Sequence, residues 1–477
     1  MVFPQLLSSL KRGWWFTPTK SRCYERPLSH QQMRMGFGAI VLVNCILRFW
    51  RLATPRPLTF DEVYYVGFAA DILHNQAFFD AHPPLGKYLI ALSIQGFQTL
   101  QTTLGQPDQS WAQWMLNPVS YRWLNAGIGT LVPLLGGWLA WEWGRGYSQR
   151  RRQTFALLAA LLISLNGLLL VESRLALLHV PLVALGLIGL SAWERSRHSP
   201  LAFLWRLLAG LALGACINIK WNGAGYLLAV WCLEGYRNLR DRTHNIPREV
   251  TRPWLWLGIL PGAAYLLCWL PYLKLTGHSL WNIHQYLWQF HTQLTTTHPY
   301  ESAWYTWPLM VRPLAYFYQG MVTGETLGIG PATPSPTTAV AVYGMDNPFL
   351  VWLGTAVIVA LLLRQGLRFR IVRDDSFPLL SPPKYLLATY LANWLPWAFV
   401  GRSTFFYHYL SSALMAAVGV AWLMSQWLTS DRSSWRWMGW GILGVIAAGF
   451  LFWLPLWMGW PLSIESLQQH FWLPSWR

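Results

Sequence analysis

About eleven stretches of the chain are apolar over the length that a membrane-crossing helix needs, which is roughly 20 residues. This feature constrains the fold most, because helices that are apolar on all sides must be buried in a core or in a bilayer. Charged residues make up only 12% of the chain, about half of the roughly 25% in an ordinary soluble domain. We therefore expect an all-α polytopic membrane protein with about 11 transmembrane helices, at 35–52, 122–143, 153–172, 177–193, 201–219, 222–236, 254–272, 347–363, 384–400, 408–427 and 437–457.

The basic residues predict how these helices are oriented. Segments 1–34 and 145–152 are rich in Lys and Arg, and such segments stay on the cytoplasmic side. If the weaker apolar segment 88–104 also crossed, 145–152 would lie outside, so we expect 88–104 to lie along the outer interface. The net charge of +17 is then an orientation signal and gives no indication of nucleic-acid binding.

This topology divides the chain into parts on the two sides of the membrane. Spacing of apolar residues over 283–294 predicts a second interfacial helix, and the Gly-, Pro- and Thr-rich stretch 320–346 predicts a loop. The expected parts are a cytoplasmic N-terminal segment 1–34, a transmembrane core 35–272 with a first outer loop 53–121, an outer loop 273–346, and C-terminal helices with an outer tail, 347–477.

Two adjacent carboxylates open the chemistry of the first outer loop. Asp61 and Glu62 follow the first apolar stretch, and neighbours along a helix or strand point in different directions. One can act as a base while the other orients a ligand or balances charge. The alternative is that the acidic pair caps the helix expected over 63–73.

The same loop contains the motif HPPLGK (82–87). Two prolines make a stiff turn, which would hold His82 and Lys87 at the membrane surface. Lys87 can then pair with a lipid phosphate, or it can simply extend its ammonium to the interface. Asp61, Glu62, Asp80 and His82 are also oxygen and nitrogen ligands for a divalent metal, but their spacing matches no specific metal site.

Further ionisable residues lie at the outer ends of the expected helices, where such groups are usually functional or paired. Glu172 and Arg174 could neutralise each other, and His179 is interpreted as a satisfied or orienting residue. Lys220 has no acidic neighbour in the sequence. Outer cations beside an acidic pair suit the binding of a phosphorylated lipid while a carboxylate activates a hydroxyl. The candidates are Arg48, Arg122, Glu172, Arg174, Lys220, Arg402, Tyr407 and His408.

In order along the chain, these motifs resemble the protein O-mannosyltransferases, and particularly their bacterial members. The likeness covers most of the chain and is specific in its combination of acidic pair, HPPLGK and Trp-Pro segments. The motifs are the stretch from Arg48 to Pro55, FDEVYYVG (60–67), FFDAHPPLGK (78–87), LNGLLLVESRLALLH (165–179), LGACINIKWNG (213–223), SAWYTWPLMVRP (302–313) and YLANWLPWAFVGRSTFFYHYL (390–410).

The resemblance implies a GT-C glycosyltransferase fold and a reaction. A sugar, mannose by family default, would pass from a polyprenyl-phosphate donor to Ser or Thr hydroxyls of exported proteins, on the outer face of a bacterial plasma membrane. Asp61 would be the base of an inverting displacement, and Glu62 would orient the acceptor or balance the outer cations. His82, Lys87, Arg174, Lys220 and Arg402 would hold the donor phosphate, with Arg48, Arg122, Glu172, Tyr407 and His408 as support. No cofactor is required.

Some features depart from the family pattern and leave the sugar open. Tyr64 stands where many members have His, and His179 stands where members commonly have Asp. The long outer loop lacks the β-trefoil domain of eukaryotic members, which favours a bacterial enzyme. Dimerisation is a further expectation, since eukaryotic relatives pair.

Three other classes of function compete with this interpretation. A related GT-C enzyme could glycosylate a lipid or a cell-wall polymer. A transporter would carry its charges near the bilayer midplane on broken helices, whereas here they gather at outer ends. An assembly protein without catalysis would leave the outer carboxylates and cations unexplained.

Overall fold

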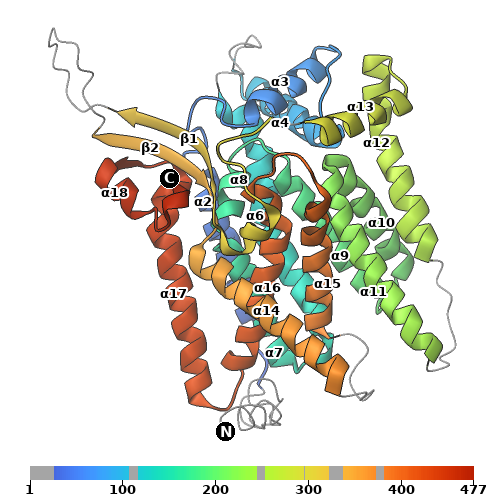
Figure 1. The fold of residues 1–477 in the computed structure, drawn as a ribbon, viewed down its shortest axis with the longest axis vertical. Helices are drawn as coiled ribbons and strands as arrows, with labels where there is room; N and C mark the ends of the chain where they lie inside the picture. The colour runs from blue at the N-terminus through green and yellow to red at the C-terminus, as the bar shows by residue number, and fades with distance from the viewer. Residues whose placement is uncertain (1–25, 107–116, 244–252, 295, 322–336, 372–380) are drawn as a thin grey trace.

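The computed structural model describes residues 26–106, 117–243, 253–294, 296–321, 337–371 and 381–477. The predicted segment 1–34 therefore lies mostly outside the described residues. Long helices run roughly side by side through the molecule, and shorter elements cover one end of this bundle (Figure 1). We call the end that carries α3, α4 and α13 the upper end, and the opposite end the lower end.

Every predicted span coincides with a helix or a helix pair. Within the described residues, seven helices are long and apolar enough to cross a membrane, or up to eight if the bent pair α7–α8 is one span; the larger number of eleven stays a prediction. The segments are α2 (His30–Phe49), α6 (Pro118–Trp143), α7 (Gln149–Ser164), α8 (Gly167–Ser173), α9 (His179–Ser196), α10 (Ala202–Ile219), α11 (Ala224–Thr243), the π-helical η3 (Leu255–Ile259) with α12 (Leu260–Thr276), α14 (Pro348–Ile371), α15 (Pro382–Trp394), α16 (Leu410–Leu428) and α17 (Ser433–Met458).

The core lies around α16, which is almost wholly buried. It packs against α7, α14, α15 and α17, while α10 packs on α9 and α12. Helices α7 and α8 meet at an angle of 63°, and Asn166 between them caps α8 through the Leu169 N–H. Because of this bend, α8 lies inside the bundle beneath the upper end (Figure 1).

Three helices outside the set of membrane-crossing candidates build the upper end: α3 (Glu62–Leu73), α4 (Leu85–Thr103) and α13 (Leu280–Gln293). Segments 88–104 and 283–294 are thus helical as predicted. Helix α13 buries Ile283 and Leu287 and exposes Trp281 and Trp288, a pattern typical of a helix at a membrane interface.

A small antiparallel sheet was not predicted from the sequence. Strand β1 (Leu314–Met321) pairs with β2 (Thr338–Gly344), and β2 pairs with β3 (Pro461–Ser463). The fold is therefore not purely α-helical, and the expectation of a loop over 320–346 was wrong for its last part. The register of β1 shifts between Ala315 and Phe317, which places Tyr316 in a β-bulge.

Short helices complete the chain: η1 (Gly144–Gly146), η2 (Trp221–Gly223), η4 (Trp304–Leu309), η5 (Leu395–Phe399), η6 (Phe406–Tyr409), α18 (Ile464–Gln469) and η7 (Pro474–Trp476).

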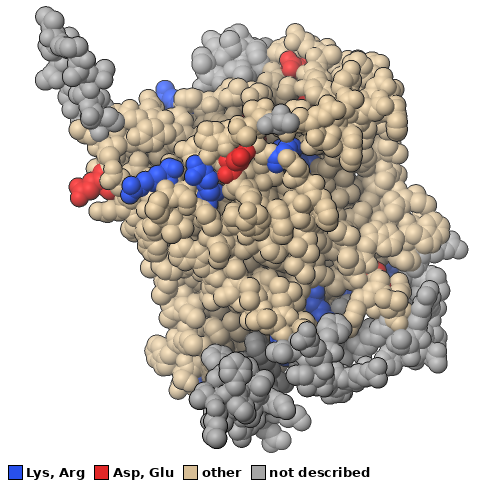
Figure 2. Space-filling model, viewed as in Figure 1, with Lys and Arg blue, Asp and Glu red and all other residues tan. Residues whose placement is uncertain are grey.

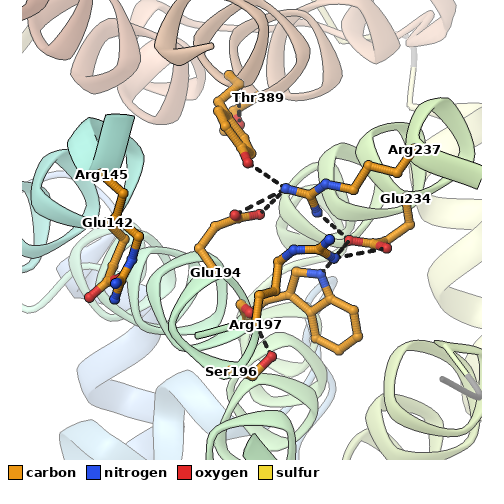
Figure 3. A network of polar contacts seen from close by, with 10 residues as sticks. Glu142, Arg145, Glu194, Ser196, Arg197, Glu234, Arg237 and Thr389 are labelled. Carbon is orange, nitrogen blue, oxygen red and sulfur yellow. Dashed lines mark hydrogen bonds and ion pairs between the residues drawn. The ribbon is translucent and has the colours of Figure 1, made fainter. Parts of the chain in front are cut away.

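Charged side chains are unevenly distributed over the visible face of the molecule. Figure 2 shows a broad uncharged belt across the visible face, with the charges above and below it. At the lower end, a buried network joins α9, α11 and α15 (Figure 3). Arg237 Nη2 lies 2.9 Å from Glu194 Oε1, and its Nη1 donates to Glu234. Arg197 adds a second cation 3.1 Å from Glu234.

Candidate functional site

The two adjacent carboxylates of the first loop have different environments. Asp61 precedes α3, but its side chain makes no capping hydrogen bond, so the capping interpretation is wrong for this residue. Its Oδ2 has one long contact, 3.4 Å from the Tyr65 hydroxyl. Phe60 before it has a φ of 55°, in the left-handed region that bulky residues rarely adopt. The Phe60 ring stacks on the Tyr316 ring, with 4.8 Å between the ring centres. This packing fixes the backbone position from which the Asp61 side chain extends.

Glu62 is fully occupied by a buried ion pair. Arg122 Nε and Nη2 donate to its two oxygens at 2.8 and 2.6 Å, and both side chains are 0% exposed. Glu62 also accepts the backbone N–H groups of Thr59 and Ala176. The rest of the Arg122 guanidinium donates to backbone carbonyls of the loop, at Leu52, Pro55 and Pro57. This pair fastens the loop to α6, which favours a supporting role for both residues.

Lys87 also has its donors occupied. An ammonium has three N–H donors, and Lys87 Nζ lies 2.5 Å from Asp80 and 2.6 Å from the carbonyls of His82 and Pro83. The side chain is 0% exposed. All three donors of Lys87 thus have partners in this structure, and they hold the HPPLGK turn together, which favours a supporting role over the expected contact with a phosphate.

Two arginines of the predicted set, Arg48 and Arg174, are buried and form hydrogen bonds with residues of α2 and of the turn after it. Arg174 donates to the carbonyls of Leu47, Arg48 and Trp50 at 2.8 to 3.2 Å and of Arg51 at 3.1 Å. It satisfies the carbonyls that end this helix, so it is neither paired with Glu172 nor free for a phosphate. Arg48 is fully buried and donates to Asn44.

Glu172, His179 and Lys220 form a connected group. His179 Nδ1 lies 2.8 Å from Glu172 Oε2, and His179 Nε2 lies 3.0 Å from Lys220 Nζ. The second Glu172 oxygen accepts the hydroxyl of Tyr316. His179 is thus a satisfied, orienting residue as predicted. Lys220 also lies 5.5 Å from the centre of the Tyr407 ring.

A cavity of about 770 Å³ lies beside Lys220. Its polar part includes His82, Lys220, His291, Arg402 and His408, and its apolar part includes Leu228, Trp288, Pro396, Phe399 and Val400. The cavity therefore combines a cationic and imidazole-rich end with an apolar end. Elements from the whole chain meet here: the first loop, α11, α13, η5 and the segment before η6.

His408 presents an unpartnered ring nitrogen at this cavity. Its Nδ1 lies 3.0 Å from the Phe405 backbone nitrogen and 3.1 Å from the Phe405 carbonyl oxygen, while its Nε2 has no partner among the described residues. The ring is 2% exposed and lies 4.3 Å from the Trp397 ring. Arg402 is half-buried and makes no ion pair with any described residue; its guanidinium contacts only the Ser403 carbonyl, at 3.5 Å.

The electrostatics differ from those of exposed groups. Burial raises the pKa of Asp61 to about 6, although the charge of Lys220 opposes the shift. Burial lowers the pKa of Lys220 to about 8. Burial and then the Lys220 charge hold the pKa of His82 well below its usual range, and burial and Arg402 lower that of His291 to about 4. Near neutral pH the site thus holds neutral imidazoles, a charged lysine and a carboxylate close to titration.

Sequence reasoning missed two residues of this site. Tyr316 reaches Glu172 because a β-bulge re-aims its side chain, and no sequence signal marked that bulge. His291 lies in the amphipathic helix α13, 5.6 Å from the His82 ring; its position at the inner side of that helix was a signal that could have been used. Tyr64, which departs from the family pattern, is 62% exposed.

In the described parts of the chain, no group of three or more His, Cys, Asp and Glu side chains is placed to hold a metal ion.

Comparison with known proteins gives two consecutive matches. Residues 38–278 match the family described as dolichyl-phosphate-mannose-protein mannosyltransferase, and residues 276–476 match the C-terminal four-transmembrane region of protein-O-mannosyltransferase. The chain belongs to the protein O-mannosyltransferase family. The resemblance drawn from the sequence motifs is therefore confirmed.

Relatives within this family match almost the whole chain. The polyprenol-phosphate-mannose–protein mannosyltransferases of Mycolicibacterium smegmatis and Mycobacterium tuberculosis are each 24% identical over 94% of this chain, and the match covers 94% and 93% of their own lengths.

Solved structures show the same fold. The Saccharomyces cerevisiae protein O-mannosyltransferase Pmt1-Pmt2 complex bound to the sugar donor aligns with a TM-score of 0.77 at 14% identity, over 95% of this chain and 94% of that one. ArnT from Cupriavidus metallidurans bound to undecaprenyl phosphate aligns with a TM-score of 0.52 at 16% identity, over 90% and 65% of the two chains. The expected GT-C fold is confirmed.

Proposed function

We propose that this protein O-mannosyltransferase moves mannose from a polyprenyl-phosphate donor to Ser or Thr hydroxyls of exported proteins. One observation carries the proposal: Asp61 makes no ion pair with a described residue but interacts electrostatically with Lys220, and Lys220 lines a partly cationic, partly apolar cavity. Unpaired buried charges are costly and concentrate at functional sites. The names of the mycobacterial relatives support the donor and the protein acceptor.

The cavity suits a lipid phosphate in its two-part lining. Lys220 and Arg402 provide positive charge, and His408 Nε2, which has no partner among the described residues, provides a further hydrogen-bonding group. Leu228, Phe399 and the other apolar residues continue from this end. A phosphate at the cationic end of the cavity and a polyprenyl chain along its apolar end would match the two kinds of lining.

Asp61 is the proposed base. A pKa of about 6 lets it accept a proton near neutral pH. The Ser or Thr oxygen attacks the anomeric carbon, the proton passes to Asp61, and the bond from that carbon to the phosphate oxygen breaks with inversion. The phosphate gains negative charge as it leaves, and Lys220 and Arg402 would stabilise this charge. Phosphate needs no general acid to leave, so a second free carboxylate is not required.

The proposed location follows from the charge distribution of the sequence. Basic segments flank the lower end of the bundle, so this end would face the cytoplasm. The site would then lie on the outer face of a bacterial plasma membrane, where exported acceptors arrive. Pairing of two copies remains a proposal of the same kind, supported by the Pmt1-Pmt2 complex.

The test uses purified protein, labelled polyprenyl-phosphate-mannose and two peptides that differ only in Ser/Thr against Ala. We expect label in the Ser/Thr peptide alone, with the anomeric configuration inverted. Label in an added lipid or glycan acceptor, with neither peptide labelled, would contradict the proposal. That outcome would favour a GT-C enzyme for another acceptor, a class to which the shared fold with ArnT gives some support.

A further inference from the structure

A buried chain of hydrogen bonds connects three elements behind the proposed phosphate end of the cavity. Glu172 lies in α8, His179 begins α9, and Lys220 directly follows α10. The imidazole lies 2.8 Å from the carboxylate and 3.0 Å from the ammonium. None of the three residues is more than 3% exposed. The imidazole is therefore a spacer between a buried acid and a buried base.

When Lys220 is charged, the protons of this chain have one consistent arrangement. An ammonium only donates hydrogen bonds, so His179 Nε2 must accept from Lys220. The neutral ring then carries its proton on Nδ1 and donates it to Glu172 Oε2. The other oxygen of Glu172 accepts from the Tyr316 hydroxyl. Glu172 is thus ionised, His179 neutral and Lys220 charged, with every link satisfied.

The spacer keeps Lys220 available for an anion. Lys87 in the same region shows the alternative, because it contacts Asp80 directly and uses all three N–H donors within the protein. Lys220 uses one N–H on an uncharged partner and makes no ion pair with a described residue. We propose that Glu172 and His179 are positioning residues that hold Lys220 charged and oriented to bind the donor phosphate.

This inference rests on the proposed function and adds two residues to it. Helix α8 and the start of α9 do not depend on the Glu172 side chain for their shape. Asn125 donates to the backbone carbonyls of Glu172 and Leu175, and the surrounding leucines are fully buried. Conservative changes at Glu172 and His179 should therefore alter Lys220 without unfolding its surroundings.

The charge of Glu172 supports the charge of Lys220 across the imidazole. Burial lowers the pKa of Lys220 to about 8, and the carboxylates of Asp61, Glu172 and Asp80 oppose that shift. Removal of the Glu172 charge should lower this pKa further, so Lys220 would lose its proton at a lower pH. The other titratable or charged groups that face Lys220 are His82, His179, His291, Arg402, Tyr407 and His408.

The experiment measures binding of undecaprenyl phosphate to the full-length protein in detergent, through the concentration-dependent rise in Tm. His179→Leu removes the acceptor for Lys220, and we expect its Kd to rise at least about 10-fold, the loss typical of one hydrogen bond to a charged group. His179→Gln offers an amide oxygen near the Nε2 position and should stay within about 3-fold of the wild type.

The pH dependence gives a readout that a purely structural role would not move. In Glu172→Gln, the loss of binding at alkaline pH should begin about 0.5 to 1 pH unit lower than in the wild type, because the supporting anion is gone. Glu234→Gln is the matched control, since it changes a buried glutamate of the lower network. It should lower the Tm of the ligand-free protein and leave the Kd and its pH dependence unchanged.

Two results would overturn the inference in distinguishable ways. If the wild type binds undecaprenyl phosphate and all the Glu172 and His179 variants bind it with the same Kd and pH dependence, the positioning role is refuted while the proposed function stands. If the wild type binds no undecaprenyl phosphate, the proposed donor fails and the inference falls with it.

Discussion

The molecule buries two clusters of charged side chains, one at each end of the helix bundle, and they are built on opposite principles. In the lower network every carboxylate lies against arginine: Glu194 and Glu234 contact Arg237, and Glu142 contacts Arg145 (Figure 3). At the upper end, Asp61, Lys220 and Arg402 make no ion pair with any described residue. Buried charge alone therefore does not distinguish the site, which is marked instead by an acid and two cations that come together without ion pairs to described residues.

The upper end also contains paired charges, and these mark its frame. Glu62 with Arg122, and Lys87 with Asp80, are buried pairs at 2.6 and 2.5 Å. The first pair holds the first loop against α6, and the second holds the HPPLGK turn together. Asp61 and Lys220 make no such pair with a described residue. A buried pair is costly to break and neutral toward ligands, whereas an unpaired group is costly to keep and ready to bind. The predictions below test this division.

The largest effect on stability is expected from Arg237→Met. The substitution leaves Glu194 without a cation and Glu234 with only Arg197, and breaking a buried pair in this way costs about 3–5 kcal/mol. We expect a clear fall in Tm and, in the fraction that stays folded, an unchanged KM for the donor. Thermal unfolding and transfer kinetics in detergent check both. A changed donor KM would show that the lower network is not purely structural.

Lys220→Met should have the opposite profile. It removes an unpaired buried cation, so Tm should stay the same or rise. Loss of a charged hydrogen bond to the phosphate should lower kcat/KM about 100-fold. Lys87→Met is the contrasting variant, since it breaks a pair and should lower Tm. If Lys220→Met and Lys87→Met lowered Tm equally, the claim that only the paired lysine contributes to stability would be contradicted.

The activity should depend on pH through Asp61. Burial raises the pKa of this carboxyl from its usual value to about 6, and only the ionised form can accept a proton. Below pH 6, kcat/KM should therefore fall about tenfold per pH unit. The measurement is a pH profile at low donor concentration, with Tm followed at each pH. Full activity at pH 4.5 would contradict the assignment of the base.

Arg402→Gln should have the smallest effect. The guanidinium is half-buried, so solvent and salt screen its charge more than that of Lys220. We expect kcat/KM to fall about 5- to 10-fold, and the sensitivity of donor KM to ionic strength to decrease. Transfer assays at about 0.05 and 0.5 M salt measure this. An effect as large as that of Lys220→Met would place both cations on the phosphate equally.

The helices could be predicted from the sequence because apolar length is a local signal, and every expected span is helical. The sheet could not, because no local signal marked the pairing of β1 with β2, or the pairing of β2 with β3, which lies far along the chain. The acidic pair and the motif HPPLGK indicated the region in which the candidate site lies, and His82 of the motif lines its cavity.

The sequence could not show which cations near the candidate site have free hydrogen-bond donors, and the reason is physical. Arg174 and Lys87 differ from Lys220 in their partners, and those partners are backbone carbonyls and side chains brought together by the fold. Arg174 contacts carbonyls of residues more than 120 positions away. The sequence could mark each of these residues as ionisable at an outer helix end, but it could not show which donors were already used.

The most direct test of the account is transfer by Asp61→Asn, with Asp71→Asn in the helix that follows, α3, as the control. The account predicts that Asp61→Asn binds undecaprenyl phosphate like the wild type and transfers mannose about 10²- to 10⁴-fold more slowly, the range for loss of a general base. Asp71→Asn should transfer normally. Transfer by Asp61→Asn at the wild-type rate would contradict the central claim that the unpaired carboxylate of the upper end performs the chemistry.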